Sequence, residues 1–185
     1  MGGPSLRRRG ILLLSSFLLV SVVLVGLLFA LAKVEKISVF TVSGSSMEPL
    51  YHSGEVLFVK KPPKLSDGMT VFFHPPSSFL QKNEPHQPPA SIFVKHIEAT
   101  PGQVLSYSKG AFYVNGKLIF STHAMDYYCP LQKPFHLRLG KEIFVLGVNA
   151  SDSLDSRYVF CNYGVNFLVP LKNVVDYGNV VFHSW

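Results

Sequence analysis

The chain has 185 residues, of which 48% are apolar and only 15% are charged. This composition argues against disorder, and the absence of an evident repeat excludes solenoid and collagen-like proteins. Half of the net charge of +6 comes from Arg7, Arg8 and Arg9, which stand just before an uncharged apolar run. Charge concentrated at such a place is typical of membrane insertion and does not predict a nucleic-acid partner.

The apolar run predicts one transmembrane helix over residues 11–32, after a cytoplasmic basic tail of residues 1–10. At about 1.5 Å per residue it spans roughly 33 Å, which is enough for a bilayer core. A cleaved secretory signal is the alternative, but its apolar core usually has about 7–15 residues. Because the three arginines outweigh Lys33 and Lys36 after the run, we expect the N-terminus inside and the rest of the chain outside.

After the run, residues 33–41 are expected to form a linker and a first strand, and residues 42–185 a domain outside the membrane. Short β-branched runs interrupted by Gly, Pro and Asn predict a mainly β, antiparallel domain. Asn115 and Gly116 predict a two-residue hairpin turn. Residues 75–91 contain five prolines, so we expect a helix-free surface insertion. The expected strands are Ile37–Val42, Val56–Lys60, Thr70–His74, Ile92–Ala99, Ala111–Val114, Leu118–Phe120, Glu142–Leu146 and Val174–Phe182.

The sequence contains none of the common metal or nucleotide motifs. Seven histidines form no HExxH, the two cysteines form no CxxC, and no glycine-rich phosphate loop is present. We therefore expect no metal, no nucleotide and no other cofactor. Cys129 and Cys161 both fall outside the membrane, where a disulfide and two buried thiols are both compatible with the sequence.

A serine cluster, Ser43–Pro49, follows the first expected strand and contains a candidate nucleophile. Gly44 lets the backbone turn where a substrate carbonyl approaches, and Pro49 fixes the chain beyond Ser46. Such a stretch is in most proteins a turn with solvated hydroxyls. A serine nucleophile needs a base, which can be a histidine or a neutral lysine.

Lys95 is the candidate base because strand alternation places it on the same face as Phe93, Ile97 and Ala99. Burial on an apolar face lowers the pKa of a lysine amine, so that the neutral form can accept a proton. The alternative is an edge lysine that extends its amine to water. His96 falls on the polar face and is expected at the surface.

The third cluster is the polar stretch Gly147–Arg157. It is typical of a turn in which Asp155 and Arg157 form a local ion pair, worth little if exposed. Its functional interpretation is that a hydroxyl of the stretch orients the lysine amine while the ion pair holds the loop.

Together and in this order, the clusters resemble the type I signal peptidase family of membrane-bound Ser-Lys endopeptidases. The family's S-M-x-P box is similar to Ser46–Pro49, and its Gly-Asp box is similar to Gly54–Leu57. Its K-R-V-x-G-x-P-G-D box is similar to Lys95–Gln103, and its G-D-N-x-x-x-S-x-D-S-R box matches Gly147–Arg157 without a gap. Four boxes in order behind an N-terminal apolar run make this resemblance specific.

The resemblance implies a role for each matching residue. Ser46 would be the nucleophile, Lys95 the general base, and Ser153 a hydrogen-bond partner of the lysine amine. The backbone N–H of Ser46 would belong to the oxyanion hole. Some members add a serine hydroxyl two residues before the nucleophile; this position is Gly44 here, so the hole would rely on backbone donors.

Asp155 and Arg157 would support the loop that carries Ser153. Three positions depart from the family: Leu50 replaces a threonine, His96 an arginine and Val148 an aspartate. The last two changes remove opposite charges together, so we hypothesise that they are linked.

The resemblance implies an antiparallel β domain whose apolar face lies against a membrane. It also implies removal of signal peptides from exported preproteins after small residues in an Ala-X-Ala pattern, at the plasma membrane or an organelle's inner membrane. A specialised conjugative-transfer-type peptidase that matures one pilin-like precursor is an alternative. Another is a noncatalytic, membrane-anchored β domain that binds extended peptides, although it would not need Ser46, Lys95 and Ser153 together.

Overall fold

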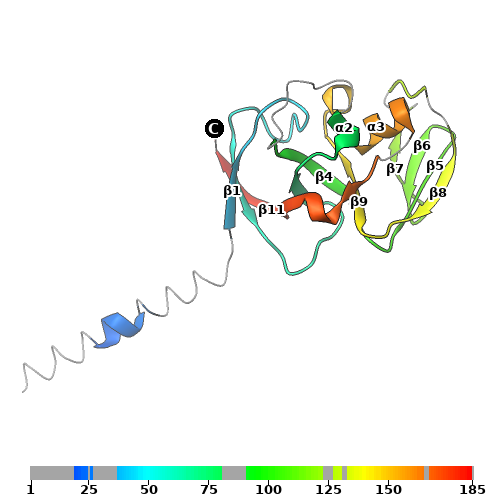
Figure 1. The fold of residues 1–185 in the computed structure, drawn as a ribbon. Helices are drawn as coiled ribbons and strands as arrows, with labels where there is room; N and C mark the ends of the chain where they lie inside the picture. The colour runs from blue at the N-terminus through cyan, green and yellow to red at the C-terminus, as the bar shows by residue number, and fades with distance from the viewer. Residues whose placement is uncertain are drawn as a thin grey trace, which may run out of the picture. The chain divides into compact units, whose positions relative to one another are not determined.

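The computed structural model describes residues 19–24, 26, 37–80, 91–122, 127–130, 133–164 and 167–184 (Figure 1). The chain divides into two compact units, Met1–Lys36 and Ile37–Trp185. In the first unit, residues 19–24 and 26 are helical, and the rest of the expected tail and span lies outside the described residues. No helix among the described residues is both long and apolar enough to cross a membrane.

The described residues of the second unit form two antiparallel sheets, which confirms the mainly β expectation. The larger has seven strands in the order β1-β2-β11-β3-β4-β9-β10, and the smaller has four in the order β7-β6-β5-β8. The strands are β1 (Ile37–Thr41), β2 (Val56–Lys60), β3 (Thr70–Phe73), β4 (Phe93–Ala99), β5 (Val104–Ser108), β6 (Ala111–Val114), β7 (Lys117–Ser121), β8 (Phe135–Arg138), β9 (Glu142–Leu146), β10 (Val169–Pro170) and β11 (Val174–Ser184).

All eight expected strands are present, within a few residues of their predicted ends, whereas β5, β8 and β10 were not expected. The hairpin between β6 and β7 is also confirmed, because Asn115 and Gly116 have φ values of 50° and 80°. Both residue types tolerate this left-handed conformation, which a two-residue hairpin turn requires.

Two α-helices correct the sequence expectations. Within the proline-rich insertion, the short helix α2 (Ser77–Leu80) buries Phe79 against Phe73, with ring centroids 6.2 Å apart. Residues 81–90 of the insertion lie outside the described residues. Helix α3 (Ser156–Tyr163) begins inside the stretch that we expected to be a turn, and Asp155 caps it by accepting a hydrogen bond from the Tyr158 N–H. The 3₁₀ turns are η1 (Ala150–Asp152) and η2 (Leu171–Asn173).

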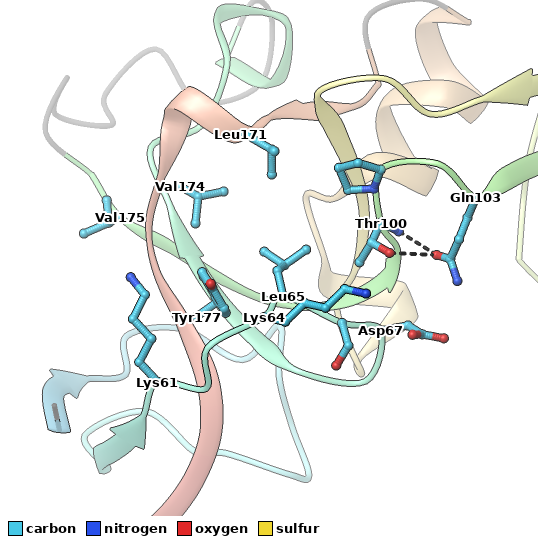
Figure 2. Close-up of a pocket in the computed structure, with 12 residues that line it drawn as sticks. Lys61, Lys64, Leu65, Asp67, Thr100, Gln103, Leu171, Val174, Val175 and Tyr177 are labelled. Atoms are coloured by element: carbon cyan, nitrogen blue, oxygen red, sulfur yellow. Dashed lines mark hydrogen bonds between the residues drawn. The ribbon is translucent and has the colours of Figure 1, made fainter. Parts of the chain in front are cut away.

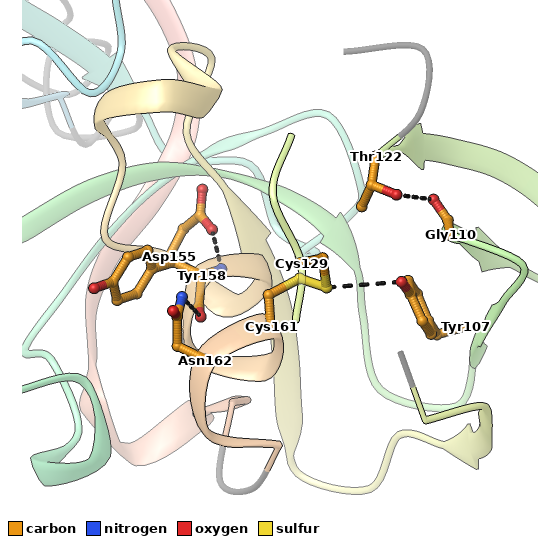
Figure 3. Close-up of a disulfide and its surroundings, with 8 residues drawn as sticks. All are labelled: Tyr107, Gly110, Thr122, Cys129, Asp155, Tyr158, Cys161 and Asn162. Atoms are coloured by element: carbon orange, nitrogen blue, oxygen red, sulfur yellow. Dashed lines mark hydrogen bonds between the residues drawn. A yellow bond between two sulfur atoms is a disulfide. The ribbon is translucent and has the colours of Figure 1, made fainter. Parts of the chain in front are cut away.

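Aromatic side chains connect the two sheets and α3. The Phe112 ring of the smaller sheet lies 5.3 Å from Phe144 of β9 and 5.4 Å from Phe160 of α3, measured between centroids. Beside this core, Cys129 and Cys161 form a disulfide that joins residues 127–130 to α3 (Figure 3). The core and the disulfide together fix α3, which follows directly on the loop of the candidate site.

Candidate active site

Ser46 lies in a turn that follows β1 and is anchored by its neighbour. The Met47 side chain is fully buried in a small core with Val42 and Leu57, and its carbonyl accepts hydrogen bonds from the Leu50 and Tyr51 N–H groups. Gly44, at φ +88°, supplies the left-handed backbone at the start of the turn. Ser46 is therefore half-buried on a fixed turn, as a nucleophile requires.

Lys95 comes from the middle of the larger sheet, because β4 pairs with β3 on one side and β9 on the other. The predicted alternation is confirmed: Lys95, Ile97 and Ala99 are all buried, and Lys95 is only 3% exposed. Its Nζ donates to Ser46 Oγ at 2.8 Å and to the Val94 carbonyl at 3.0 Å. Two residues 49 positions apart in sequence are thus in direct contact, and the amine does not extend into solvent.

Burial shapes the acid–base behaviour of this amine. Desolvation lowers the pKa of Lys95 from 10.5 to about 8; Arg157 also lowers it, while Asp155 and Asp152 oppose the shift. Near neutral pH a useful fraction of the amine is therefore unprotonated. In that form the nitrogen lone pair can accept the Ser46 hydroxyl proton across the same contact.

The Asp155–Arg157 pair is buried, in contrast to the exposed local pair that the sequence also allowed. The two side chains are 0% and 1% exposed, with 2.6 Å between Arg157 Nη2 and Asp155 Oδ2. The same carboxylate oxygen accepts the Gly147 N–H at 2.8 Å. The guanidinium lies over the Phe120 ring at 4.5 Å and the Tyr127 ring at 4.9 Å. These contacts hold the loop between β9 and α3.

Ser153 is buried on this loop, next to the turn that carries Ser46. A Cβ at Gly147 would overlap with Ser153 Oγ and lie 2.6 Å from the Ser46 carbonyl oxygen, so the close approach requires glycine. Among the described residues, the Ser153 hydroxyl has no hydrogen-bond partner. The expected bond to the Lys95 amine is therefore not formed in this arrangement.

Two residues for which the sequence predicted no role join the loop to the turn that carries Ser46. The Asn149 N–H donates to the Ser46 carbonyl at 3.1 Å, and its Nδ2 donates to the Ser45 carbonyl at 3.3 Å. Asp152 accepts a hydrogen bond from Ser45 Oγ. Both residues fall inside the last sequence box, and this was the only signal that could have pointed to them.

An open cavity of about 520 Å³ leads to the pair. One wall consists of residues 40–44, at the end of the edge strand β1, and the other of residues 91–95, at the start of β4. Within the described residues, no acceptor binds the Ser46 N–H. The remaining lining side chains are Ser46, Phe72, Asp152 and Leu154.

The departures at His96 and Val148 line one small cavity of about 160 Å³, together with Glu98 and Arg157. His96 is half-buried, and desolvation lowers its pKa, which corrects the expectation of a surface histidine. The third departure, Leu50, is exposed. The shared cavity is consistent with the hypothesis that the first two changes are linked.

A separate cavity of about 670 Å³ contains none of the expected site residues (Figure 2). Its Lys61 lies 3.1 Å from Asp176 Oδ1 and over the Tyr177 ring. This cation is therefore already paired within the protein. Within the described ranges, no group of three or more His, Cys, Asp or Glu side chains is arranged to hold a metal ion.

Comparison with known proteins places the chain in a family. The model of the family described as signal peptidase, peptidase S26 matches residues 14–185. The chain belongs to this family. This confirms the resemblance drawn from the four sequence boxes.

Two curated relatives have similar sequences. The chain is 30% identical to the probable signal peptidase I-2 of Synechocystis over 125 residues, covering 63% of this chain and 53% of that protein. It is 28% identical to the thylakoidal processing peptidase 1, chloroplastic, of Arabidopsis thaliana over 169 residues, covering 88% and 45%. The chain thus spans about half the length of these curated relatives. A crystal structure of a signal peptidase I from Enterococcus faecalis matches with 20% identity and a TM-score of 0.39, covering 64% of this chain and 97% of that one.

Proposed function

We propose that this protein is a membrane-anchored serine endopeptidase that removes N-terminal signal peptides from exported preproteins. Ser46 is the nucleophile and Lys95 the general base. The observation that carries the proposal is the 2.8 Å contact between Lys95 Nζ and Ser46 Oγ, with the amine buried and the cleft open to a substrate.

The reaction begins with neutral Lys95. Its lone pair accepts the Ser46 hydroxyl proton while Oγ attacks the scissile carbonyl carbon, giving a tetrahedral intermediate and a lysine ammonium. The ammonium then protonates the leaving amine as the C–N bond breaks, which leaves an ester on Ser46. Lys95, neutral again, accepts a proton from water as the water attacks this ester, and the proton returns to Ser46 when the ester breaks.

The negative oxygen of each intermediate needs hydrogen-bond donors. The Ser46 N–H is a suitable donor because no described residue accepts its hydrogen bond. Gly44 has no side-chain hydroxyl, so backbone N–H groups stabilise the negative oxygen. Loss of one such donor typically lowers kcat by about 10²–10³.

The loop between β9 and α3 positions the pair. Ser153 is buried beside the Ser46 backbone, and its hydroxyl, which has no partner among the described residues, is available to bond to the lysine amine during the reaction. Asp155 and Arg157 are positioning residues, because their buried pair holds the loop on α3.

The substrate binds as an extended strand between residues 40–44 and 91–95, which form the two walls of the cleft. The Phe40 and Phe72 rings stack with centroids 3.7 Å apart and occupy part of the cleft lining. Large rings in this lining leave less room for substrate side chains, which supports the proposed preference for small residues in an Ala-X-Ala pattern.

The proposed anchor is a single helix over residues 11–32 with the N-terminus inside, in the plasma membrane or an organelle's inner membrane. Apolar side chains on the outer domain support a membrane location. Val39 of β1 pairs with Phe58 of β2, which pairs with Phe182 of β11; Val39 and Phe182 are both more than half exposed. Such an exposed apolar face is typical of contact with lipid or protein.

Cleavage of a model preprotein with an Ala-X-Ala site by the detergent-solubilised protein tests the proposal. Ser46→Ala and Lys95→Ala should each reduce cleavage to background while remaining folded. Ser66→Ala and Lys64→Ala, in the separate cavity, are the matched controls and should cleave normally. Cleavage that persists in Ser46→Ala, or a folded wild type without activity on any preprotein, would overturn the assignment.

A further inference from the structure

The cleft carries a negative side chain that the proposed mechanism does not use. Asp152 lines the same cavity as Ser46 and Lys95, at the end of η1. Its carboxylate accepts a hydrogen bond from Ser45 Oγ, the residue immediately before the nucleophile. The carboxylate is therefore held beside the turn that carries the proposed nucleophile.

Further contacts, besides the hydrogen bond to Ser45, hold Asp152 in place relative to the proposed nucleophile. Asn149, at the other end of the same short turn, donates to the carbonyls of Ser45 and Ser46. The loop then continues into the buried Asp155–Arg157 pair. Because both ends of the turn are held, Asp152 has a defined place in the cleft despite its exposure.

The charge of Asp152 is not neutralised within the protein. Among the described residues, no lysine, arginine or histidine side chain lies within ion-pair distance of it. Lys95 is the only other ionisable side chain among the described residues that line the cavity. When Lys95 is neutral, as the proposed mechanism requires, Asp152 is the sole formal charge in this lining.

We propose that Asp152 is a specificity-determining residue that selects substrates with a lysine or arginine close to the scissile bond, either at the middle position of the Ala-X-Ala pattern or at one of the two residues after the cleavage point. The inference rests on the proposed peptidase function. A cationic side chain gains Coulomb energy beside the carboxylate, and an acidic one is repelled. Because Asp152 is exposed, the preference for lysine over glutamate should be about fivefold to tenfold, and salt should reduce it.

The test uses peptides with an Ala-X-Ala site and lysine, alanine or glutamate placed in turn at the middle position X and at each of the two residues after the cleavage point, so that both alanines of the site stay in place. We expect kcat/KM to fall in the order Lys, Ala, Glu at one or more of these positions. Asp152→Asn should remove the order and Asp152→Lys should reverse it. Asp67→Asn removes an equal charge outside the cleft and should retain the wild-type order.

Binding separates this inference from the peptidase function. The same peptides, labelled with a fluorophore, are titrated into Ser46→Ala and into Ser46→Ala combined with Asp152→Asn. Tighter binding of lysine peptides that the second substitution abolishes supports the inference, even if wild type cleaves none of them. Cleavage without any charge order, or a charge order that survives in Asp152→Asn, overturns the inference and leaves the peptidase function intact. Absence of both binding and cleavage overturns both.

Discussion

The Lys95 amine loses most of its hydration between β3 and β9, and this loss sets its acid–base behaviour. If the neutral amine is the base, kcat/KM should fall about tenfold per pH unit below the pKa of about 8. The measurement is a pH profile on a preprotein without titrating groups near its cleavage site. Asp152→Asn should move this acid limb to lower pH, since the Asp152 charge raises the pKa of Lys95. An acid limb near the usual lysine pKa would contradict the role of the neutral amine.

The same burial makes Lys95 costly for stability. Its folded pKa of about 8 lies below its usual 10.5, so the unfolded chain holds more protons between these values and stability rises with pH across that window. Below about pH 8 the penalty is fully present. Lys95→Met should therefore inactivate the protein and raise its free energy of unfolding by roughly 1–3 kcal/mol at pH 7. Urea unfolding at pH 7 and 10.5 measures this, and the gain should shrink at the higher pH. A less stable methionine variant at pH 7 would show that the amine's contacts outweigh its desolvation.

At the scale of residues, the sequence singled out the two residues that are in contact, Ser46 and Lys95, but not the residues around them. Ser46 and Lys95 stand in local patterns, a turn-forming cluster and a strand with an apolar face, that can be recognised without the fold. Asn149 and Asp152 act through contacts with a turn more than 100 positions away. Only the folded chain shows these contacts, because nothing in the spacing of a polar loop indicates which carbonyl it will meet.

Among the elements, most strands with β-branched runs were predicted, whereas the irregular strands β8 and β10 were missed, as was β5, whose burial does alternate. Strand β8 has mostly exposed side chains, and β10 contains only two residues, so neither has a clear alternating pattern. Helix α3 was hidden because its Asp155 cap and Ser156 also fit a polar turn. Tertiary contacts decide such ambiguous stretches, here the packing of α3 against β9.

The disulfide between Cys129 and Cys161 closes a loop with a sequence separation of 32. By the chain-entropy model, closing a loop of this size stabilises the folded state by about 3–4 kcal/mol. Replacing both cysteines with alanine should lower the free energy of unfolding by this order, as measured by urea unfolding. Reduction of the wild type should reproduce the loss, whereas the reductant should have no effect on the double variant. Equal stability of the oxidised wild type and the double variant would contradict a structural role for the bond.

Strand β4 and the loop before α3 meet at the small cavity that His96 and Val148 line. The cavity already contains one acidic and one basic residue, Glu98 and Arg157, so a lone arginine at 96 or a lone aspartate at 148 would add a charge without a partner of its own. We therefore expect His96→Arg and Val148→Asp to destabilise the protein singly, and the double variant to recover about 1 kcal/mol through the new pair. Urea unfolding of the four proteins gives this coupling energy. Additive effects would show that the two departures are independent.

For the whole molecule, the sequence predicted one β domain but not its division into two sheets. The elements that carry the proposed catalytic pair, β4 and the turn after β1, belong to the larger sheet. The smaller sheet contributes Phe120, one of the two rings that flank the Arg157 guanidinium. The second sheet thus supports the loop beside the candidate pair. Its contribution is a packing contact and not a sequence motif, so the sequence did not indicate it.

The orientation of the whole chain is the remaining expectation that an experiment can decide directly. The two native cysteines are joined in a disulfide, so an added cysteine would be the reactive thiol of the chain. If the arginines before the apolar run stay inside, a membrane-impermeant maleimide should label Lys172→Cys, at an exposed position, on intact cells or organelles. Ser5→Cys should be labelled only after the membrane is opened. Labelling of Ser5→Cys on intact membranes, with protection of Lys172→Cys, would place the cleft on the opposite side and rule out preproteins emerging outside as its substrates.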